Sequence, residues 1–347
     1  MRSQGYWKSY HASKANEKRQ VFRLCRRVVR KLGSPWQVAK RGRPPEHQPE
    51  EYAEIAIYRK HFHMSLRVAE GDTPLILGKR VDHSDIWWSL QRISPCYLNQ
   101  SIELFFDLIS ELFSPDLFIA DATGVTTDRY VRKRGPRLRP RGKPPPKWRK
   151  RREKRHSEDR VLVTLKLHIL IGYNIELGLL MVRSALITKG SAHDSPRLKR
   201  LLKGVRGNGK PLLLDTGYDS ENNYKLCKKH WFGPVIKLRE GKPKGLIRRE
   251  MAKVFADNKE IYRLRGLVEA VFGGLETKYG NRTRCRRTNS RRDDCLLMVV
   301  SHNLRTYMRA VALRELGFFV FLRIYWTTSP CPLCPTSTCG AQMALST

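Results

Sequence analysis

The chain has 347 residues, of which 68 are Lys or Arg and 32 are Asp or Glu, so its formal net charge at pH 7 is +36. Hydrophobic residues make up 40% of it, which argues against wholesale disorder and allows one large domain or two modest ones. A surface this cationic is typical of proteins that bind nucleic acid, because Lys and Arg neutralise phosphates and release counterions. A membrane surface and an acidic protein are the weaker alternatives as partners.

The cysteines and the apolar segments indicate a reduced protein that does not enter a membrane. Eight cysteines are spread unevenly along a chain that is long for a disulfide scaffold. The N-terminus is basic and polar and lacks the apolar stretch of a signal peptide. The longest apolar run, Gly317–Trp326, is too short to span a bilayer and contains Arg323. We therefore expect a cytoplasmic location.

Residues 1–112 are predicted to form a basic N-terminal region with a helical DNA-binding unit. Lys40–Pro45 reads KRGRPP and favours an extended strand that resembles the core of an AT-hook, with Arg41 and Arg43 along a narrow minor groove. A basic linker that touches phosphates without choosing a sequence is the favoured alternative. Glu50–Leu112 has apolar residues at roughly helical spacing, which fits either a small DNA-binding unit or a helical cap on the next domain.

After Pro115 the pattern changes to short apolar runs and alternating segments rich in β-branched residues, which predict strands. The predicted strands are Leu117–Ala120, Val161–Ile171, Leu177–Ile187, Lys210–Leu214 and Gly233–Lys237, with the second and third joined as a hairpin. The predicted helices begin at Ser195, with serine as the cap and Pro196 in the first turn, and cover Glu221–His230, Asn258–Lys278 and Arg292–Leu316. This order predicts an α/β domain over residues 115–316. Its ribonuclease-H-like mixed sheet would be flanked by helices and preceded by the small helical basic region.

A basic insertion interrupts this domain and a tail follows it. In residues 132–155, 14 of the 24 residues are Lys or Arg against a single acid, and like charges at this density cannot pack in a core. We predict that the insertion contacts DNA phosphates, with a solubilising segment as the weaker alternative. The predicted contacts include Arg149, Lys150, Arg151 and Arg152. Residues 317–347 are predicted to be a tail, disordered after residue 329, in which Cys331, Cys334 and Cys339 suggest a metal knuckle but lack a fourth ligand.

Two of the predicted strands deliver an aspartate at their carboxyl end. LFIA is followed by Asp121 and LLL by Asp215, and the strand ends of an α/β sheet are where ligands and metals bind. Two carboxylates at one place repel each other unless a cation lies between them. This favours Mg²⁺ or Mn²⁺, because these ions prefer hard oxygen ligands. A third carboxylate is expected from the helix Asn258–Lys278.

The pattern Tyr262-x2-Arg265-x3-Glu269 resembles the Y-R-E signature of the DDE transposases of insertion sequences. Other segments that resemble this family are DATGV at Asp121, KLH at Lys166–His168, HDS at His193–Ser195 and LLLDTGYDS around Asp215. The resemblance covers about residues 117–307. It departs from the family pattern at Glu276, seven residues after Glu269, where a lysine is usual.

The resemblance implies a ribonuclease-H-like catalytic domain in which Asp121, Asp215 and Glu269 hold two Mg²⁺ or Mn²⁺ ions. It implies cleavage of phosphodiester bonds at the terminal inverted repeats of an insertion sequence and transfer of the cut strands to a target. The partner is then DNA, both element ends and target, bound by a homodimer in association with a prokaryotic nucleoid. Two alternatives remain open: a non-enzymatic DNA-binding remnant of a transposase, and a metal-dependent nuclease of the same fold.

In the predicted helix Asn258–Lys278, which contains the Y-R-E pattern, several residues have two possible roles. Tyr262 and Arg265 precede Glu269 by seven and four residues, which places all three on one face of a regular helix. Arg265 is expected either to orient Glu269 or to grip a phosphate. Tyr262 is expected either to contact DNA or to pack against the helix. The pair Gly273-Gly274 is expected either to kink the helix or to let DNA approach its backbone.

Four other polar residues could belong either to the active site or to the scaffold. Lys166 and His168 share one face of their strand, where they face the active site or pack across strands. Asp194, next to Ser195, is expected to cap a helix rather than to act in catalysis. Asp219 is expected to be a turn residue rather than a ligand.

The departure at Glu276 leads to a hypothesis about DNA contacts. Seven residues turn a regular helix by about 700°, so Glu276 returns to within about 20° of Glu269, whereas Lys278 lies on the opposite face. We hypothesise that Glu276 is not a metal ligand. Phosphate contact at this end would then pass to Lys278, or to Arg282 and Arg284.

Overall fold

A computed structural model describes residues 17–38, 46–132, 160–239, 245–283 and 287–315, together with residues 7, 11, 14 and 285, and only the backbone of 128–132 and 160–163. The predicted DNA contacts Arg41, Arg43, Arg149, Lys150, Arg151 and Arg152, and the tail from residue 317, lie outside this part of the chain. Within it, no helix has the length and the apolar character needed to cross a membrane.

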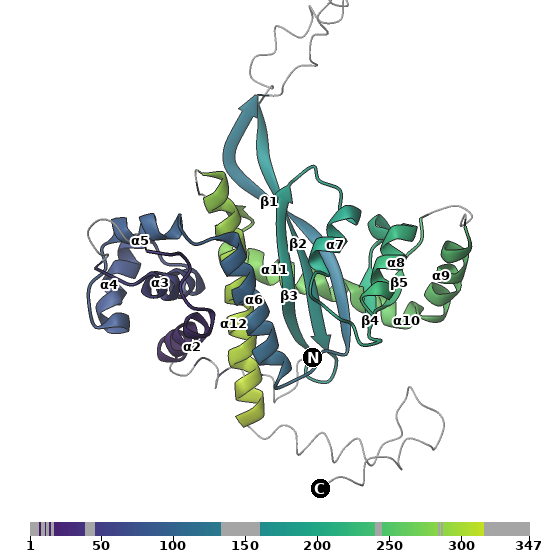
Figure 1. The fold of residues 1–347 in the computed structure, drawn as a ribbon, viewed down its shortest axis with the longest axis horizontal. Coiled ribbons are helices and arrows are strands. Elements are labelled where there is room, and N and C mark those ends of the chain that lie inside the picture. Colours follow the sequence, from purple (N-terminus) through teal and green to yellow (C-terminus); the bar gives the residue numbers. More distant parts are fainter. Residues whose placement is uncertain are drawn as a thin grey trace, which may run out of the picture.

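Six strands form one mixed sheet at the centre of the molecule (Figure 1). They are β1 (Leu117–Arg132), β2 (Arg160–Asn174), β3 (Leu179–Lys189), β4 (Pro211–Leu214), β5 (Gly233–Ile236) and β6 (Arg282–Thr283). Their order is β3-β2-β1-β4-β5, and β6 pairs with a later part of β1. β2 is antiparallel to β1 and β3, whereas β4 and β5 run parallel to β1. This order confirms the predicted ribonuclease-H-like sheet.

The central strand β1 is longer than the sequence predicted. Its apolar start is buried on both sides, with Leu117, Ile119 and Ala120 fully enclosed, as expected for a strand covered on both faces. The prediction that the strand ends at Ala120 is wrong. The β-branched residues that follow continue the pairing with β2 as far as Arg132. Asp121 therefore lies within β1, directly after the last residue that pairs with β4.

Two long helices, α6 (Pro95–Ser110) and α12 (Thr288–Glu315), pack against each other and against β3 (Figure 1). The register of β2 and β3 shifts next to the pair Ile171–Val182. Asn303 on α12 makes hydrogen bonds with both backbone polar groups of Val182. Its Oδ1 accepts from the Val182 N–H (2.8 Å), and its Nδ2 donates to the carbonyls of Val182 (2.7 Å) and of Ile102 on α6 (3.1 Å). One buried amide thus joins the sheet to both helices.

The N-terminal helices lie beside α6 and α12, on the left in Figure 1. They are α2 (Glu17–Leu32), α3 (Pro49–His61), α4 (Leu66–Leu77) and α5 (His83–Leu90), which confirms the helical prediction for this region. α3 is buried all round from Ala53 to Tyr58, as a helix at the centre of a bundle must be. The buried side chains of α2 and α3 join the same core as those of α6 and α12. A DNA-binding role for these helices, and the predicted division at residue 112, stay predictions.

The segments after β3 are short helices between strands. η2 (Ser195–Arg197) and α7 (Leu198–Leu201) precede β4, η3 (Thr216–Tyr218) and α8 (Glu221–Lys229) link β4 to β5, and α9 (Leu246–Asp257), α10 (Lys259–Tyr262), η4 (Arg263–Gly266) and α11 (Leu267–Tyr279) follow β5.

Two sequence predictions are wrong in these segments. Ser195 does not cap a helix: the residue before the 3₁₀ turn is Asp194, which has a helical conformation and makes no side-chain cap hydrogen bond. The single helix predicted over Asn258–Lys278 is divided into α10, η4 and α11. The 3₁₀ turn between them ends at Gly266, and glycine is a poor α-helix former.

Candidate active site

Strand pairing places Asp121 and Asp215 side by side. β4 runs parallel to β1, and its last residue, Leu214, is paired with Ala120. The next residue on each strand is an aspartate, so the two carboxylates emerge from neighbouring strands at the same level of the sheet. β4 ends there because Asp215 starts the 3₁₀ turn η3. The predicted meeting of the two aspartates is therefore present, although β1 does not end at this point.

The guanidinium of Arg265 lies between the two aspartates. Its Nη2 is 2.6 Å from Asp121 Oδ2 and 3.8 Å from Asp215 Oδ1. Asp121 Oδ1 also accepts a hydrogen bond of 2.8 Å from the backbone N–H of Ala122. The expected pairing of Arg265 with Glu269 is not seen among the described residues, where Arg265 pairs with the two aspartates. Its contact with a phosphate stays a prediction.

The carboxylate of Asp121 is repelled by the negative charges of the neighbouring aspartates. Burial raises the pKa of the Asp121 carboxyl above its ordinary value, and the charges of Asp215 and Asp194 act in the same direction. The Ala122 N–H and the Arg265 guanidinium lower this pKa but do not cancel the shift. The negative charges therefore need a cation, and Arg265 supplies the nearest one.

Tyr262 belongs to the same cluster. Its ring is half-buried and meets the ring of Phe255 edge-on, with the centroids 4.9 Å apart. Burial raises the pKa of the Tyr262 hydroxyl. The charge of Arg265 lowers that pKa, and those of Asp215 and Asp121 raise it further. Tyr262 thus packs against α9, as one of its two interpretations expected, while its hydroxyl stays within electrostatic reach of the aspartates.

Glu269 is not in contact with the aspartate pair. It lies in the first turn of α11 and is exposed to solvent. Within the described part of the chain, the three carboxylates do not form a group with oxygen atoms within 4.8 Å of one another. The 3₁₀ turn contributes to this, because it advances about 120° per residue instead of 100° and so rotates Arg265 and Tyr262 relative to Glu269.

A second polar group lies beside the aspartates. Lys166 Nζ is 2.6 Å from Asp194 Oδ1, and His168 Nδ1 is 3.5 Å from the same oxygen. The His168 ring is fully buried, and its Nε2 is 2.8 Å from Thr188 Oγ1. The neighbouring His193 is exposed. Asp194 therefore pairs with β2 instead of capping a helix, and its charge reaches Asp121.

Tyr218 completes this group. Its side chain is 1% exposed, and its hydroxyl has no hydrogen-bond partner among the described residues. Burial raises the pKa of this hydroxyl, and the charges of Asp194, Asp121 and Asp215 raise it further. Sequence reasoning assigned Asp194 to a cap and did not single out Tyr218. The HDS and LLLDTGYDS segments contain both residues, but a motif does not tell which of its side chains turn inward.

Asp219 has a structural role, in agreement with the expectation that it is not a ligand. Its carboxylate is buried and accepts hydrogen bonds from Arg248 (Nε, 3.1 Å), from the Arg239 N–H (3.0 Å) and from the Tyr224 hydroxyl (3.2 Å). Burial alone would raise the pKa of Asp219, but these hydrogen bonds hold it below its ordinary value. The contacts fasten α9 to the turn that follows Asp215.

The end of α11 lies away from the aspartates. α11 runs without interruption through Gly273 and Gly274, so the glycine pair does not end the helix. Glu276 is exposed, whereas Lys278 is half-buried. Burial lowers the pKa of the Lys278 ammonium to about 8, and Arg305 on α12 adds to this effect. The DNA contact predicted for Lys278 stays a prediction, and this position among helices gives it no support.

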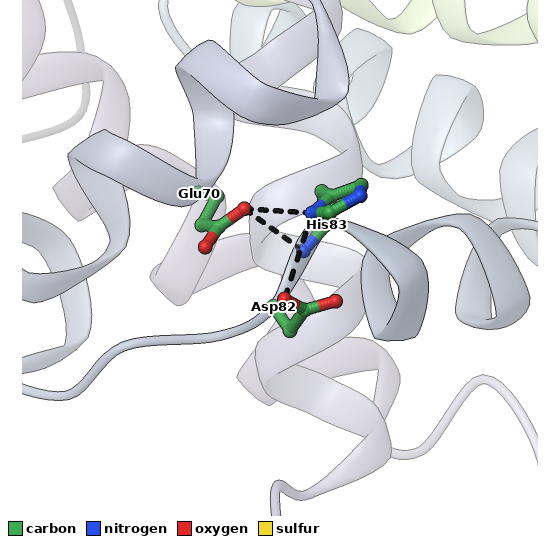
Figure 2. A group of neighbouring side chains, drawn as sticks. All are labelled: Glu70, Asp82 and His83. Atoms are coloured by element: carbon green, nitrogen blue, oxygen red, sulfur yellow. Dashed lines mark hydrogen bonds and ion pairs between the residues drawn. The ribbon is translucent and has the colours of Figure 1, made fainter.

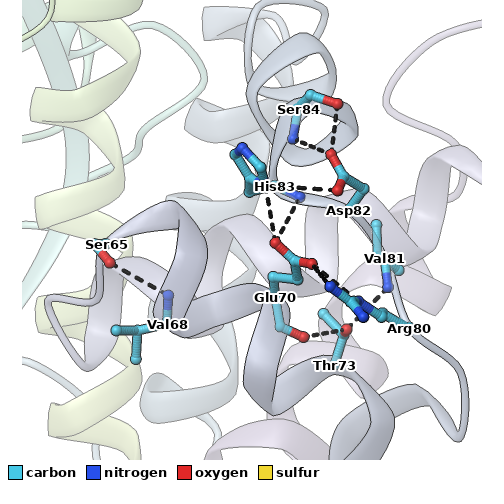
Figure 3. A network of polar contacts seen from close by, with 9 residues as sticks. All are labelled: Ser65, Val68, Glu70, Thr73, Arg80, Val81, Asp82, His83 and Ser84. Carbon is cyan, nitrogen blue, oxygen red and sulfur yellow. Dashed lines mark hydrogen bonds and ion pairs between the residues drawn. The ribbon is translucent and has the colours of Figure 1, made fainter.

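One group of three possible metal ligands exists elsewhere in the described chain, formed by Glu70, Asp82 and His83 (Figure 2). Its side chains already have partners, as Figure 3 shows. Glu70 accepts from Arg80 Nε (2.9 Å) and lies 2.9 Å from His83 Nδ1. Asp82 accepts from the Ser84 N–H (2.7 Å) and so caps α5. Because a guanidinium neutralises Glu70, this group is an anchor between α4 and α5 and not a metal centre.

Comparison with known proteins gives one finding about this chain. A sequence model of the transposase DDE domain matches residues 112–304, which is more than half of the 347 residues. The matched segment contains Asp121, Asp215 and Glu269, together with the Lys166–Asp194 group and Tyr218. No curated protein matches the chain significantly.

We expect Arg265→Met to lower the thermal stability of the protein when no divalent cation is present, because the neighbouring carboxylates of Asp121 and Asp215 lose their positive partner. The midpoint of thermal unfolding in EDTA should fall by about 1–2 °C, which corresponds to about 1 kcal/mol in a chain of this size. Mn²⁺ should raise the midpoint of the variant more than that of the wild type. The control is Arg263→Met, which removes an exposed arginine that forms an ion pair with the exposed Glu260. Equal Mn²⁺ shifts in wild type and Arg265→Met would contradict the role of Arg265 as counter-ion.

Proposed function

Since the chain belongs to the DDE transposase family, we propose that it is the transposase of an insertion sequence. It binds the terminal inverted repeats of its element, cuts the DNA there and joins the cut ends to a target. DNA is the partner that this family implies, and the net charge of +36 is suited to it. We propose that it acts as a homodimer, since an element has two ends.

The observation that carries this proposal is the contact of one guanidinium with both aspartates. Asp121 and Asp215 come from neighbouring parallel strands, and Arg265 neutralises them at 2.6 and 3.8 Å. A pair of carboxylates held this closely in a partly buried place is costly for stability alone. Such a pair is useful where a cation of higher charge is to be bound.

The residues fit a divalent-cation site. Asp121 and Asp215 offer hard oxygen ligands side by side, and we propose that Glu269 adds a third from α11, where it is exposed and makes no ion pair among the described residues. When bound there, two Mg²⁺ or Mn²⁺ ions would polarise the phosphodiester and stabilise charge on the attacking and leaving oxygens.

The other residues of the site act on the DNA. Arg265, once released from the aspartates, has a free fork of N–H donors for a phosphate, and a guanidinium binds phosphate through two parallel hydrogen bonds. Tyr262, packed on Phe255, offers the other edge of its ring to the DNA. Water or a DNA 3′-hydroxyl is the nucleophile in the proposed reaction, so no side chain forms a covalent bond to DNA.

The catalytic proposal is tested with three isosteric variants. Asp121→Asn, Asp215→Asn and Glu269→Gln each remove one ligand charge with little change in shape, so each should reduce Mg²⁺-dependent cleavage of end-containing DNA at least about 100-fold and leave DNA binding nearly intact. Cleavage is measured on labelled duplexes in single turnover. Glu276→Gln is the matched control on the same helix and should cleave close to the wild-type rate.

The outcome of this experiment separates the competing functions. Wild-type protein that binds element ends but never cuts them is a remnant. Wild-type protein that cuts but never joins ends to a target plasmid is a nuclease. If Glu276→Gln abolishes cleavage while Glu269→Gln does not, the third ligand is Glu276 and not Glu269.

We propose that the basic segment 132–155, of which residues 133–155 lie outside the described part of the chain, follows the phosphate backbone of DNA. Each phosphate neutralised steepens the slope of log affinity against log salt by about 0.9. Replacement of the segment by an uncharged linker of equal length should flatten this slope by several units and change the preference between DNA sequences much less. The slope is measured by fluorescence anisotropy at several salt concentrations. An unchanged slope would show that the segment does not touch DNA.

A further inference from the structure

Helix α2 (Glu17–Leu32) carries its apolar and its basic side chains on opposite faces. Its buried residues are 0% exposed and belong to the main core: Val21, Cys25, Val28 and Val29. At about 100° per residue, four exposed arginines lie within a sector of about 80° on the other side of the helix. This arginine face consists of Arg19, Arg23, Arg27 and Arg30. It is presented by a helix that packs against α3 and α6 and is held in place by them.

The acids that adjoin α2 do not neutralise the arginine face. Within the described part of the chain, none of its four guanidiniums forms an ion pair, whereas the neighbouring Arg26 pairs with the buried Glu54 at 3.5 Å. Residues 1–45 contain 13 Lys or Arg and a single acid, Glu17. That carboxylate is already engaged by His61 Nε2 at 3.2 Å. The segments on either side of α2 in the sequence therefore offer the arginine face no counter-charge.

The spacing of these arginines is unfavourable for the helix itself. A solvated helix face is stabilised by opposite charges three or four residues apart, as in the ion pair of Arg263 with Glu260, and like charges at this spacing destabilise it. The members of the arginine face follow each other at intervals of four, four and three residues. Arg19 also lies in the first turn of α2, where the helix dipole disfavours a cation. The face is thus costly for the protein alone, and an anionic partner would offset this cost.

We propose that the arginine face of α2 binds the phosphate backbone of duplex DNA. The transposase family of the chain favours DNA over an acidic protein as the anion, and a guanidinium binds phosphate through two parallel hydrogen bonds. From Arg19 to Arg30 the helix rises by about 16 Å, which is the axial length of about five nucleotides of one DNA strand. Phosphate contacts distinguish no bases, so the face should contribute equally to element ends and to other DNA. The inference rests on the proposed function for its partner, but it is tested on binding without cleavage.

The test compares the salt dependence of DNA binding by the wild type with that of a triple variant, Arg19→Gln/Arg23→Gln/Arg30→Gln. Arg27 is kept because it donates a hydrogen bond to the Tyr307 hydroxyl on α12 (3.4 Å). The slope of log affinity against log salt should become shallower by about 2–3 units, since each lost phosphate contact removes about 0.9. Affinity is measured by fluorescence anisotropy in EDTA, on an end-containing duplex and on a scrambled duplex of equal length. Both duplexes should show the same change.

A charge-matched control separates a local contact from the loss of total charge. Lys225→Gln/Lys229→Gln/Lys253→Gln removes three exposed cations from α8 and α9, which lie on the opposite side of the sheet from α2 (Figure 1). This control should change the slope by less than about one unit. The midpoint of thermal unfolding without DNA is a second readout. Removal of like charges should leave the midpoint of the arginine variant at or above that of the wild type, whereas a structural role of the arginines predicts a fall.

A shallower slope in the arginine variant alone, with an equal or higher midpoint, supports the proposal. An unchanged slope overturns it, and so does an equal change in the charge-matched control or a lower midpoint. If the triple variant fails to fold, Arg23→Gln decides: a slope shallower by about 0.9 supports the proposal and an unchanged slope overturns it. A wild-type protein that never cleaves element ends would contradict the proposed function, but it would leave the phosphate contact of α2 in place.

Discussion

The structure of the candidate site depends on the contact of Arg265 with Asp121 and Asp215. The parallel pairing of β1 with β4 forces the two aspartates onto neighbouring positions, and like charges at that distance require a cation. Arg265 reaches them from η4, a 3₁₀ turn in the segment that leads into α11. The protein therefore carries its own positive charge in the site. A protein that only needed a stable sheet would gain by replacing the three charges with apolar side chains.

The scaffold holds these strands through a small number of buried polar contacts. Asn303 joins α12 to the irregular part of β3 and to α6, so the long helices hold β3, the edge strand next to the strand that carries His168. On the other side, the buried carboxylate of Asp219 fastens Arg248 and the turn after Asp215. The backbone near both aspartates is thus fixed by hydrogen bonds from residues that are not part of the site. This rigidity is what a catalytic group needs.

The sequence predicted the parts of this site that follow from local pattern. Two apolar runs that are each followed by an aspartate suffice to predict that Asp121 and Asp215 meet, because the ends of neighbouring parallel strands lie at the same level of a sheet. The extension of β1 beyond Asp121 was not predictable, since it depends on pairing with β2 across a long insertion. The interrupted helix before Glu269 changed which residue Arg265 meets. The pairing of Lys166 with Asp194 joins a strand to a distant connection, and spacing along the chain contains no signal for it.

Exchange of the cation decides whether Asp121 and Asp215 bind the divalent cation that we propose for DNA cleavage. A thiolate binds Mn²⁺ better than it binds Mg²⁺, because sulfur is a softer ligand than oxygen. Asp215→Cys should therefore fail to cleave end-containing DNA in Mg²⁺ and recover cleavage in Mn²⁺, whereas Asp215→Ala should recover in neither. Cleavage by Asp215→Cys at the wild-type rate in Mg²⁺, or equal failure of both variants in Mn²⁺, would contradict direct binding of the cation by Asp215.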